Sequence, residues 1–280
     1  MGRRREAEVL RRVLLTLSLL VAPALAAALE ISGEPLQGAL LEGRTAPGSE
    51  VAVAGREVPV GPDGRFLIGL DRDAPERVEV RVTRPDGSRA REVIAVRQRD
   101  YDVQRIDGLP GNQVSPDAET LQRIRKDQAR VRAARATRRP AMDFDSGWQW
   151  PVTGPISGVY GSQRILNGQP RQPHYGIDIA VPTGTPVEAP ADGVVTLVAP
   201  DLFFSGGTLI VDHGHGLSSA FLHLSRILVE EGDAVRRGEV IAEVGATGRV
   251  TGAHLDWRMN WLDARIDPSL LVPPMDQAAE

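Results

Sequence analysis

The chain has 280 residues, of which 41% are hydrophobic and 25% charged. This composition is typical of a soluble globular protein and excludes global disorder, and the length allows two ordinary domains. The formal net charge is −4 and cysteine is absent. A surface without a basic excess argues against a nucleic-acid partner, and without cysteine no disulfide framework can form. Abundant Gly and Pro with few aromatic residues favour short strands joined by turns.

The first 28 residues have the layout of a secretory signal peptide. An apolar run over residues 13–28 follows the arginines Arg3, Arg4, Arg5, Arg11 and Arg12, and Ala24 and Ala26 offer an A-x-A cleavage site. The run is short for a membrane span, so an uncleaved N-terminal anchor is the alternative and would be the chain's membrane contact. Cleavage after residue 26 would change the formal net charge from −4 to −7. We therefore expect a periplasmic or secreted protein.

Residues 29–105 predict a small β-sandwich-like domain. Short alternating runs such as Val78-Glu-Val-Arg-Val82 are separated by turns such as Pro62-Asp-Gly64 and Pro85-Asp-Gly87. In these turns Pro presets φ and Gly supplies a positive φ. Several short strands over 70 or so residues favour a sandwich. The segment carries no histidine, and we interpret it as a spacer or binding module.

Residues 106–145 are interpreted as a linker that contains a helix, after an irregular connection over residues 100–115. The sequence Ser115-Pro116-Asp117 is a helix-start pattern, with a cap, Pro in the first turn and an acid that favours the helix dipole. The apolar residues at helical spacing are Leu121, Ile124 and Val131. A solvated helix with one thin apolar stripe is the default interpretation. A regulatory arm that lies on the next domain is the alternative.

The C-terminal segment, residues 146–272, carries every histidine of the chain and precedes a tail of residues 273–280. These histidines are His174, His213, His215, His223 and His254. Histidine is the commonest metal ligand and a proton shuttle near neutral pH. The clustering therefore places the chemistry in this segment, where Gly-rich turns again separate short β patterns.

Three motifs in this segment carry donor atoms. In His174-Tyr-Gly-Ile-Asp178, an imidazole and a carboxylate lie four residues apart, and both are good zinc ligands. In His254-Leu-Asp256, the two side chains share one face of a strand. In Phe221-Leu-His223-Leu-Ser225, one histidine interrupts an apolar run. Taken singly, each has an ordinary explanation, such as a surface histidine near an acid or a hydrogen-bonded core histidine.

In their order and spacing, these motifs resemble the lysostaphin-type (LytM-type) family of zinc endopeptidases. The resemblance covers most of residues 146–272 and implies a mainly β chain, whose antiparallel β-sheet peptidase domain has an open groove. It implies Zn²⁺ bound by His174, Asp178 and the residue at position 256, with His223 and His254 as the catalytic pair. Residues assigned to the substrate groove are Arg164, Asn167 and His215.

The chain departs from the family pattern at the third ligand, where the family has His and this sequence has Asp256. Aspartate is an acceptable zinc ligand, but a second carboxylate reduces the charge and Lewis acidity of the metal. The favoured function is a zinc endopeptidase that hydrolyses peptide cross-links of bacterial peptidoglycan, with peptide stems as the partner. The alternative is an inactive family member that binds peptidoglycan or activates a separate cell-wall amidase.

Overall fold

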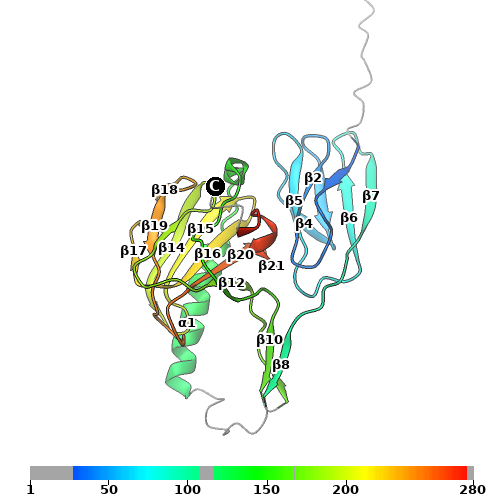
Figure 1. Cartoon of the computed structure of the whole chain (residues 1–280). Helices are drawn as coiled ribbons and strands as arrows, with labels where there is room; N and C mark the ends of the chain where they lie inside the picture. The colour runs from blue at the N-terminus through cyan, green and yellow to red at the C-terminus, as the bar shows by residue number, and fades with distance from the viewer. Residues whose placement is uncertain (1–27, 107–116, 167, 276–280) are drawn as a thin grey trace, which may run out of the picture.

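The computed structural model describes residues 28–106, 117–166 and 168–275, so the expected signal peptide lies outside the described residues apart from its last position. Two layers of antiparallel strands form the N-terminal unit (Figure 1). One sheet has the order β1-β2-β5 and the other the order β4-β3-β6-β7. The strands are β1 Glu30–Ser32, β2 Leu40–Arg44, β3 Glu50–Val53, β4 Arg56–Val58, β5 Arg65–Gly69, β6 Arg77–Thr83 and β7 Arg89–Ala95.

Alternation along the strands builds the core of this unit. In β6, Val78, Val80 and Val82 are buried whereas the residues between them are half-buried or exposed. Successive side chains of a strand point to opposite faces, so one face of the sheet is apolar and the other solvated. The prediction of a mainly β chain with antiparallel sheets is confirmed.

A short strand replaces part of the irregular connection that the sequence suggested at residues 100–115. Strand β8, Val103–Ile106, pairs in parallel with β10, Gln163–Leu166, and β10 pairs with β11, Gln169–Pro170. The partner of β8 lies about 60 residues further along the chain, so local composition gives no sign of it. The segment is thereby fixed to the loop that precedes His174.

Helix α1, Ala118–Arg135, begins at Asp117, whose side chain accepts a hydrogen bond from Thr120 N at 2.8 Å. Most residues of the helix are exposed, as the default interpretation expects, but its apolar stripe lies across one face of the large C-terminal sheet (Figure 1). This placement agrees with the alternative interpretation of an arm that lies on the next domain. Val131 and Ala134 pack with apolar sheet residues, which are Leu197, Ala199, Leu202, Ile210, Ala220 and Leu222.

The C-terminal unit contains an eight-stranded antiparallel sheet of order β18-β14-β15-β16-β20-β12-β9, with β21 paired to β20. Its strands are β9 Ile156–Gly158, β12 Gly176–Ile179, β14 Gly193–Leu202, β15 Gly206–Gly214, β16 Leu217–Leu224, β18 Ala234–Val235, β20 Leu255–Trp261 and β21 Ala264–Ile266. A small sheet has the order β13-β19-β17, with β13 Pro186–Glu188, β17 Arg226–Ile227 and β19 Val240–Glu243. Two 3-10 turns, η2 Asp143–Ser146 and η3 Pro268–Leu270, complete the fold. Strands β15 and β16 are buried along their whole length, so both faces of the sheet centre are covered.

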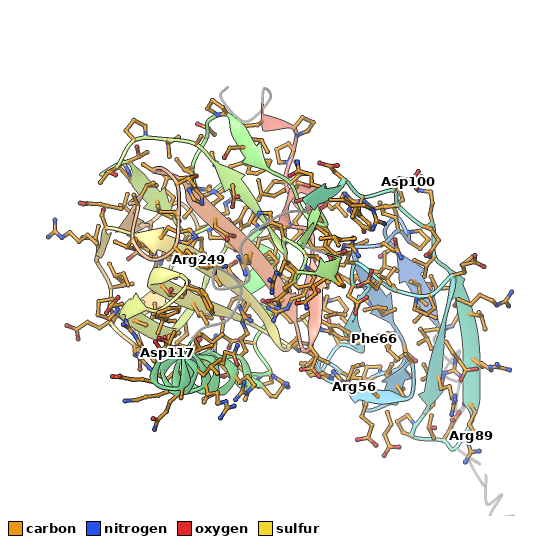
Figure 2. The ribbon with its side chains drawn as sticks, turned by 90° about the horizontal axis from the view of Figure 1, so that it is seen from below. Arg56, Phe66, Arg89, Asp100, Asp117 and Arg249 are labelled. Carbon is orange, nitrogen blue, oxygen red and sulfur yellow. The ribbon has the colours of Figure 1, made fainter. Side chains whose placement is uncertain are left out.

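The sandwich packs against the β20–β21 side of the large sheet, whereas the start of α1 and Arg249 lie toward the other side of the molecule (Figure 2). Arg99 Nη1 donates to Asp267 Oδ2 at 2.8 Å, and Asp267 N donates to Gly38 O at 2.8 Å. Buried apolar residues of both units belong to one continuous core. We propose that the sandwich, the linker and the C-terminal unit meet at about residues 105 and 145, although the two folded units share this core. Within the described ranges, no helix has the length and apolarity of a membrane span.

His213 is a fully buried histidine of β15 whose two ring nitrogens both have partners. Nδ1 lies 2.6 Å from Asp192 O and Nε2 lies 2.8 Å from Ser219 Oγ. The Trp148 ring packs edge-on against it at 5.1 Å between centroids. Burial lowers the pKa of His213 from 6.5 to about 4. The folded protein therefore holds this imidazole in its neutral form.

Because the folded pKa of His213 is depressed, the unfolded chain binds a proton between pH 6.5 and about 4 that the folded chain does not. The free energy of unfolding should therefore fall on acidification through this window, with a contribution of at most about 1.4 kcal/mol per pH unit from this residue. The free energy of unfolding, measured by denaturant titration at several pH values from 4 to 7, should fall less steeply with acidification in His213→Gln than in the wild type. An equal pH dependence in the two proteins would contradict a neutral, buried His213.

Candidate metal and catalytic site

Two carboxylates face each other across neighbouring strands. Strands β12 and β20 pair antiparallel, and their register places Asp178 directly opposite Asp256. Glycines make room for both groups. A Cβ on Gly158 would lie 2.3 Å from Asp178 Oδ2, and one on Gly176 would lie 2.5 Å from Asp256 Oδ1. Like charges directly opposite each other destabilise a sheet, so this arrangement requires nearby cations.

His174 precedes β12 and turns its ring toward the acids. Its Nε2 lies 3.2 Å from Asp178 Oδ1. Both atoms are buried, and neither has a hydrogen-bond partner among the described residues. One donor atom from each of His174, Asp178 and Asp256 falls within 4.8 Å of the others. Buried, unpartnered nitrogen and oxygen donors at this spacing fit a divalent metal ion such as zinc.

Asp256 differs from the other two donors because it already has a cationic partner. Arg258 Nε lies 2.9 Å from Oδ1 and 3.0 Å from Oδ2, and Nη2 lies 2.5 Å from Oδ2. Asp256 is 2% exposed. Burial opposes its charge, but the Arg258 guanidinium outweighs burial and holds the pKa of Asp256 below its usual range. A carboxylate oxygen has two lone pairs, so Oδ1 retains one for a metal.

His223 and His254 stand side by side next to these donors, with ring centroids 4.9 Å apart. His223 Nδ1 lies 2.8 Å from Thr247 O, and His254 Nδ1 lies 2.9 Å from Gly252 O. Because a carbonyl oxygen can only accept, each Nδ1 carries a proton, and Nε2 is the nitrogen of each ring that is left to accept one.

The environment of His223 favours a neutral base. Burial lowers the pKa of His223 below its ordinary value, so the ring is unprotonated near neutral pH. Its backbone has a φ of 65°, in the left-handed region that few residues other than glycine adopt. Such backbone strain persists where surrounding contacts enforce it, and here His223 N donates to Ser205 O at 2.9 Å.

The structure thus brings His174, Asp178 and Asp256 together, with His223 and His254 beside them. His215 requires a correction, because it lies at the turn between β15 and β16, at the end of β16 remote from His223. It is buried, its Nε2 lies 3.1 Å from Pro140 O, and its ring packs edge-on against Phe144. The side chains of Arg164 and Asn167 lie outside the described residues.

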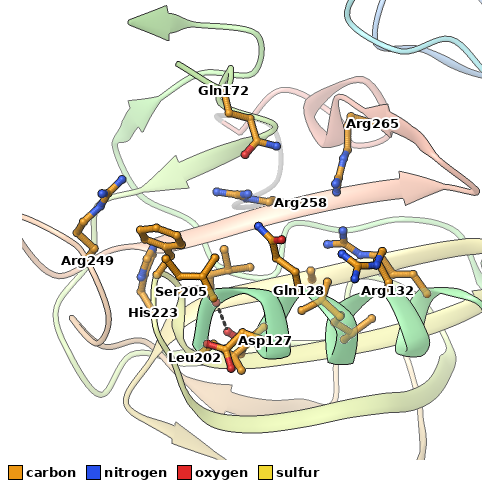
Figure 3. Close-up of a pocket in the computed structure, with 18 residues that line it drawn as sticks. Asp127, Gln128, Arg132, Gln172, Leu202, Ser205, His223, Arg249, Arg258 and Arg265 are labelled. Atoms are coloured by element: carbon orange, nitrogen blue, oxygen red, sulfur yellow. Dashed lines mark hydrogen bonds between the residues drawn. The ribbon is translucent and has the colours of Figure 1, made fainter. Parts of the chain in front are cut away.

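Sequence reasoning missed Arg258 and the cavity that it lines. The cavity has a volume of about 470 Å³, lies between α1 and the large sheet, and includes His223 in its wall (Figure 3). The spacing Asp256-Trp-Arg258 places both charged groups on one strand face, which is a signal that could have revealed the ion pair. The contribution of α1 has no comparable signal in the sequence.

Comparisons with known proteins identify relatives of this chain. The sequence model of Peptidase family M23 matches residues 172–268. The chain is 39% identical over 142 residues to the peptidoglycan DD-endopeptidase ShyA of Vibrio cholerae, covering 48% of this chain and 31% of that protein. It is 39% identical over 127 residues to the lipoprotein NlpD/LppB homolog of Pseudomonas aeruginosa, covering 45% of this chain and 40% of that protein. The chain therefore spans less than half the length of these two curated relatives.

The crystal structure of a Pseudomonas aeruginosa protein assigned to peptidase M23 matches over nearly its full length. The two chains are 32% identical with a TM-score of 0.67, and the match covers 85% of this chain and 95% of that chain. It therefore includes the N-terminal sandwich as well as the C-terminal unit.

Replacing Arg258 tests whether the Asp256 carboxylate binds a metal ion as well as the Arg258 guanidinium. Arg258→Met leaves Asp256 buried and unpaired opposite Asp178, so the metal-free protein should lose about 3–5 kcal/mol of stability. Zinc should then raise the thermal midpoint of Arg258→Met by more than it raises that of the wild type, because it would supply the missing cation.

The control is Arg226→Met, since Arg226 forms an exposed ion pair with Glu243 at 3.5 Å. An equal zinc-induced shift in Arg258→Met and wild type would count against Asp256 as a ligand.

Proposed function

We propose, from the premise that the chain belongs to peptidase family M23, that it is a zinc-dependent endopeptidase acting on peptide cross-links of bacterial peptidoglycan. The observation that carries this proposal is the pair of buried atoms His174 Nε2 and Asp178 Oδ1, which have no hydrogen-bond partner among the described residues. Beside them lie two histidines whose Nδ1 atoms are hydrogen-bonded to backbone carbonyls. A metal site next to proton acceptors is the arrangement that metal-assisted hydrolysis needs.

His174, Asp178 and Asp256 would hold the zinc ion. When bound, zinc supplies Lewis acidity that polarises the scissile carbonyl and acidifies the attacking water. The two carboxylates would fix its position from adjacent strands, and Arg258 would offset the second negative charge. These donors lie on the rigid pairing of β12 with β20, which favours a fixed geometry.

His254 and His223 would handle the protons. His254 Nε2 lies 3.9 Å from Asp178 Oδ1 and is the proton acceptor adjacent to the ligands. It would take the proton of the attacking water and later give it to the leaving amine. His223, whose ring centroid lies 4.9 Å from that of His254, would accept a hydrogen bond from the second O–H of the water at Nε2 and so orient it. The hydrogen bonds from each Nδ1 to a backbone carbonyl fix both rings in the required tautomer.

The names of the relatives support the proposed substrate, and the N-terminal sequence supports the proposed location. One similar protein is named a peptidoglycan DD-endopeptidase, and the proposed bond here joins D-alanine to meso-diaminopimelate. The proposed partner is the peptide stem of the wall, and the proposed location is the periplasm or outside the cell, reached through the N-terminal signal segment.

A second candidate function has one observation in its favour. The ion pair of Asp256 with Arg258 competes with metal at the third ligand position. A chain with weakened zinc affinity could serve as a module that binds peptidoglycan or activates a separate amidase. Zinc content and hydrolysis, measured on the same preparation, separate the two functions.

Two substitutions should separate metal binding from proton transfer. Asp178→Asn should lose bound zinc and hydrolysis of cross-linked muropeptides together, because it removes a ligand charge. His223→Ala should keep zinc but lose about 10²–10⁴-fold in rate. Metal content by mass spectrometry and products by chromatography give the two readouts. Asp201→Asn, at an exposed acid remote from the site, is the matched control.

Asp256→His restores the family's third ligand and tests the alternative. An active aspartate site should keep its zinc and lose only modest activity through changed geometry. A wild type without zinc at micromolar metal, inert on muropeptides, that gains both in Asp256→His would establish the non-catalytic function instead.

A further inference from the structure

The cavity between α1 and the large sheet has an apolar floor and a cationic wall. Its floor is formed by residues such as Ile124, Leu202 and Leu222. A volume of about 470 Å³ matches a small ligand or a short piece of peptide, not a polymer strand. Because His223 lines the cavity, a group bound there would lie next to the proposed catalytic pair.

Positive charge dominates the described lining of this cavity. Five arginines contribute to it: Arg132, Arg135, Arg249, Arg258 and Arg265. Figure 3 shows Arg258 and Arg265 on the strand side and Arg132 on the helix side of the same space. Asp127 is the one acid among the lining residues, and its Oδ2 accepts from Phe203 N at 2.8 Å.

Most of this positive charge has no negative partner among the described residues. Arg258 is paired with Asp256, but Arg265 donates to the neutral amide oxygen of Asn260 at 3.1 Å. Arg249 lies over the Phe204 ring, 4.6 Å from its centroid. A cluster of arginines with so little acid around it is the usual counterpart of carboxylate or phosphate recognition.

Arg135, the last residue of α1, differs from the other arginines of the cavity in having a buried nitrogen that is unpaired among the described residues. Its Nε is buried and has no hydrogen-bond partner in the described part of the chain. Burial first, and then repulsion from Arg265 and Arg258, lower its pKa to about 9. A buried cation without a partner is costly, and a bound anion would remove that cost. Arg135 and Arg265 therefore point to an anionic ligand.

We propose that this cavity binds the free carboxylate of the peptide cross-link, on the carbon that carries the leaving amine, through Arg135 and Arg265. This inference rests on the proposed function. In a cross-link to meso-diaminopimelate, the acylated amine and a free carboxylate share one carbon, so the carboxylate lies next to the scissile bond. His223, Arg135 and Arg265 line the same cavity, so a ligand that extends along it can contact all three. The short apolar stem of the residue fits the apolar floor.

The test compares two cross-linked muropeptides that differ only in this group, one with the carboxylate and one with the carboxamide. The wild-type chain should cleave the carboxylate form with at least about tenfold higher kcat/KM, as charge-assisted pairing predicts. Arg135→Gln should remove the preference, and Arg135→Lys should restore part of it. Arg125→Gln, an exposed arginine on the same helix, should leave the preference unchanged. Arg265→Gln, at the other side of the cavity, is a second variant that should remove the preference for the carboxylate form.

A binding measurement separates this inference from the proposed function. Calorimetry with the uncross-linked tetrapeptide stem, in its carboxylate and carboxamide forms, requires no hydrolysis. Preferential binding of the carboxylate stem, together with no cleavage of either cross-linked muropeptide, would refute the enzyme and leave the cavity assignment standing. Cleavage of both muropeptides at equal kcat/KM would overturn the cavity assignment and leave the enzyme standing. Competition by inorganic phosphate with no difference between the two stems would also overturn it, since it would show a general anion site.

Discussion

The juxtaposition of Asp178 and Asp256 across two paired strands is the constraint on which the site depends. Their register places two negative charges opposite each other in a buried region of the sheet. Such a pair needs compensation, and the structure supplies it on the Asp256 side through Arg258. On the Asp178 side, the described residues place only two imidazoles near Oδ1, with His174 Nε2 at 3.2 Å and His254 Nε2 at 3.9 Å, and Oδ1 has no hydrogen-bond partner among them. The unequal compensation is what singles out the His174 side as the place for a metal cation.

The linker helix α1 adds positive charge beside the site. Helix α1 is anchored by a few apolar residues on the outer face of β14–β16, and its polar side closes a cavity beside His223. Its C-terminal turn brings Arg132 and Arg135 to arginines from β20 and the segment after it. Like charges gathered at one cavity destabilise the free protein, so their presence is more readily explained by an anionic ligand than by stability. The wall of the groove therefore comes partly from outside the segment that carries the motifs.

Much of the site was predictable because its residues follow local rules. The His-x-x-x-Asp and His-x-Asp spacings name donors that strand geometry then gathers, and the alternation of β6 reveals its buried face. Strand β8 was not predictable, since its stability comes from β10, which is remote in sequence. The docking of α1 stood only as an alternative in the sequence, because a few apolar contacts suffice when the sheet already presents an apolar face. His215 was assigned to the groove, but it lies in the turn after β15, at the end of β16 remote from His223.

The Asp256–Arg258 pair also bears on how an aspartate can stand where the family has histidine. A set of two histidines and one carboxylate contributes one negative charge to a zinc ion. Replacing a neutral imidazole by Asp256 adds a second negative charge, and the adjacent guanidinium cancels it, because Arg258 contacts both oxygens of the carboxylate. The aspartate and arginine together therefore carry the same net charge as the neutral imidazole. In the proposed zinc site, Lewis acidity at the metal would therefore be preserved by a residue that does not touch the metal, so position 258 has to be considered together with position 256.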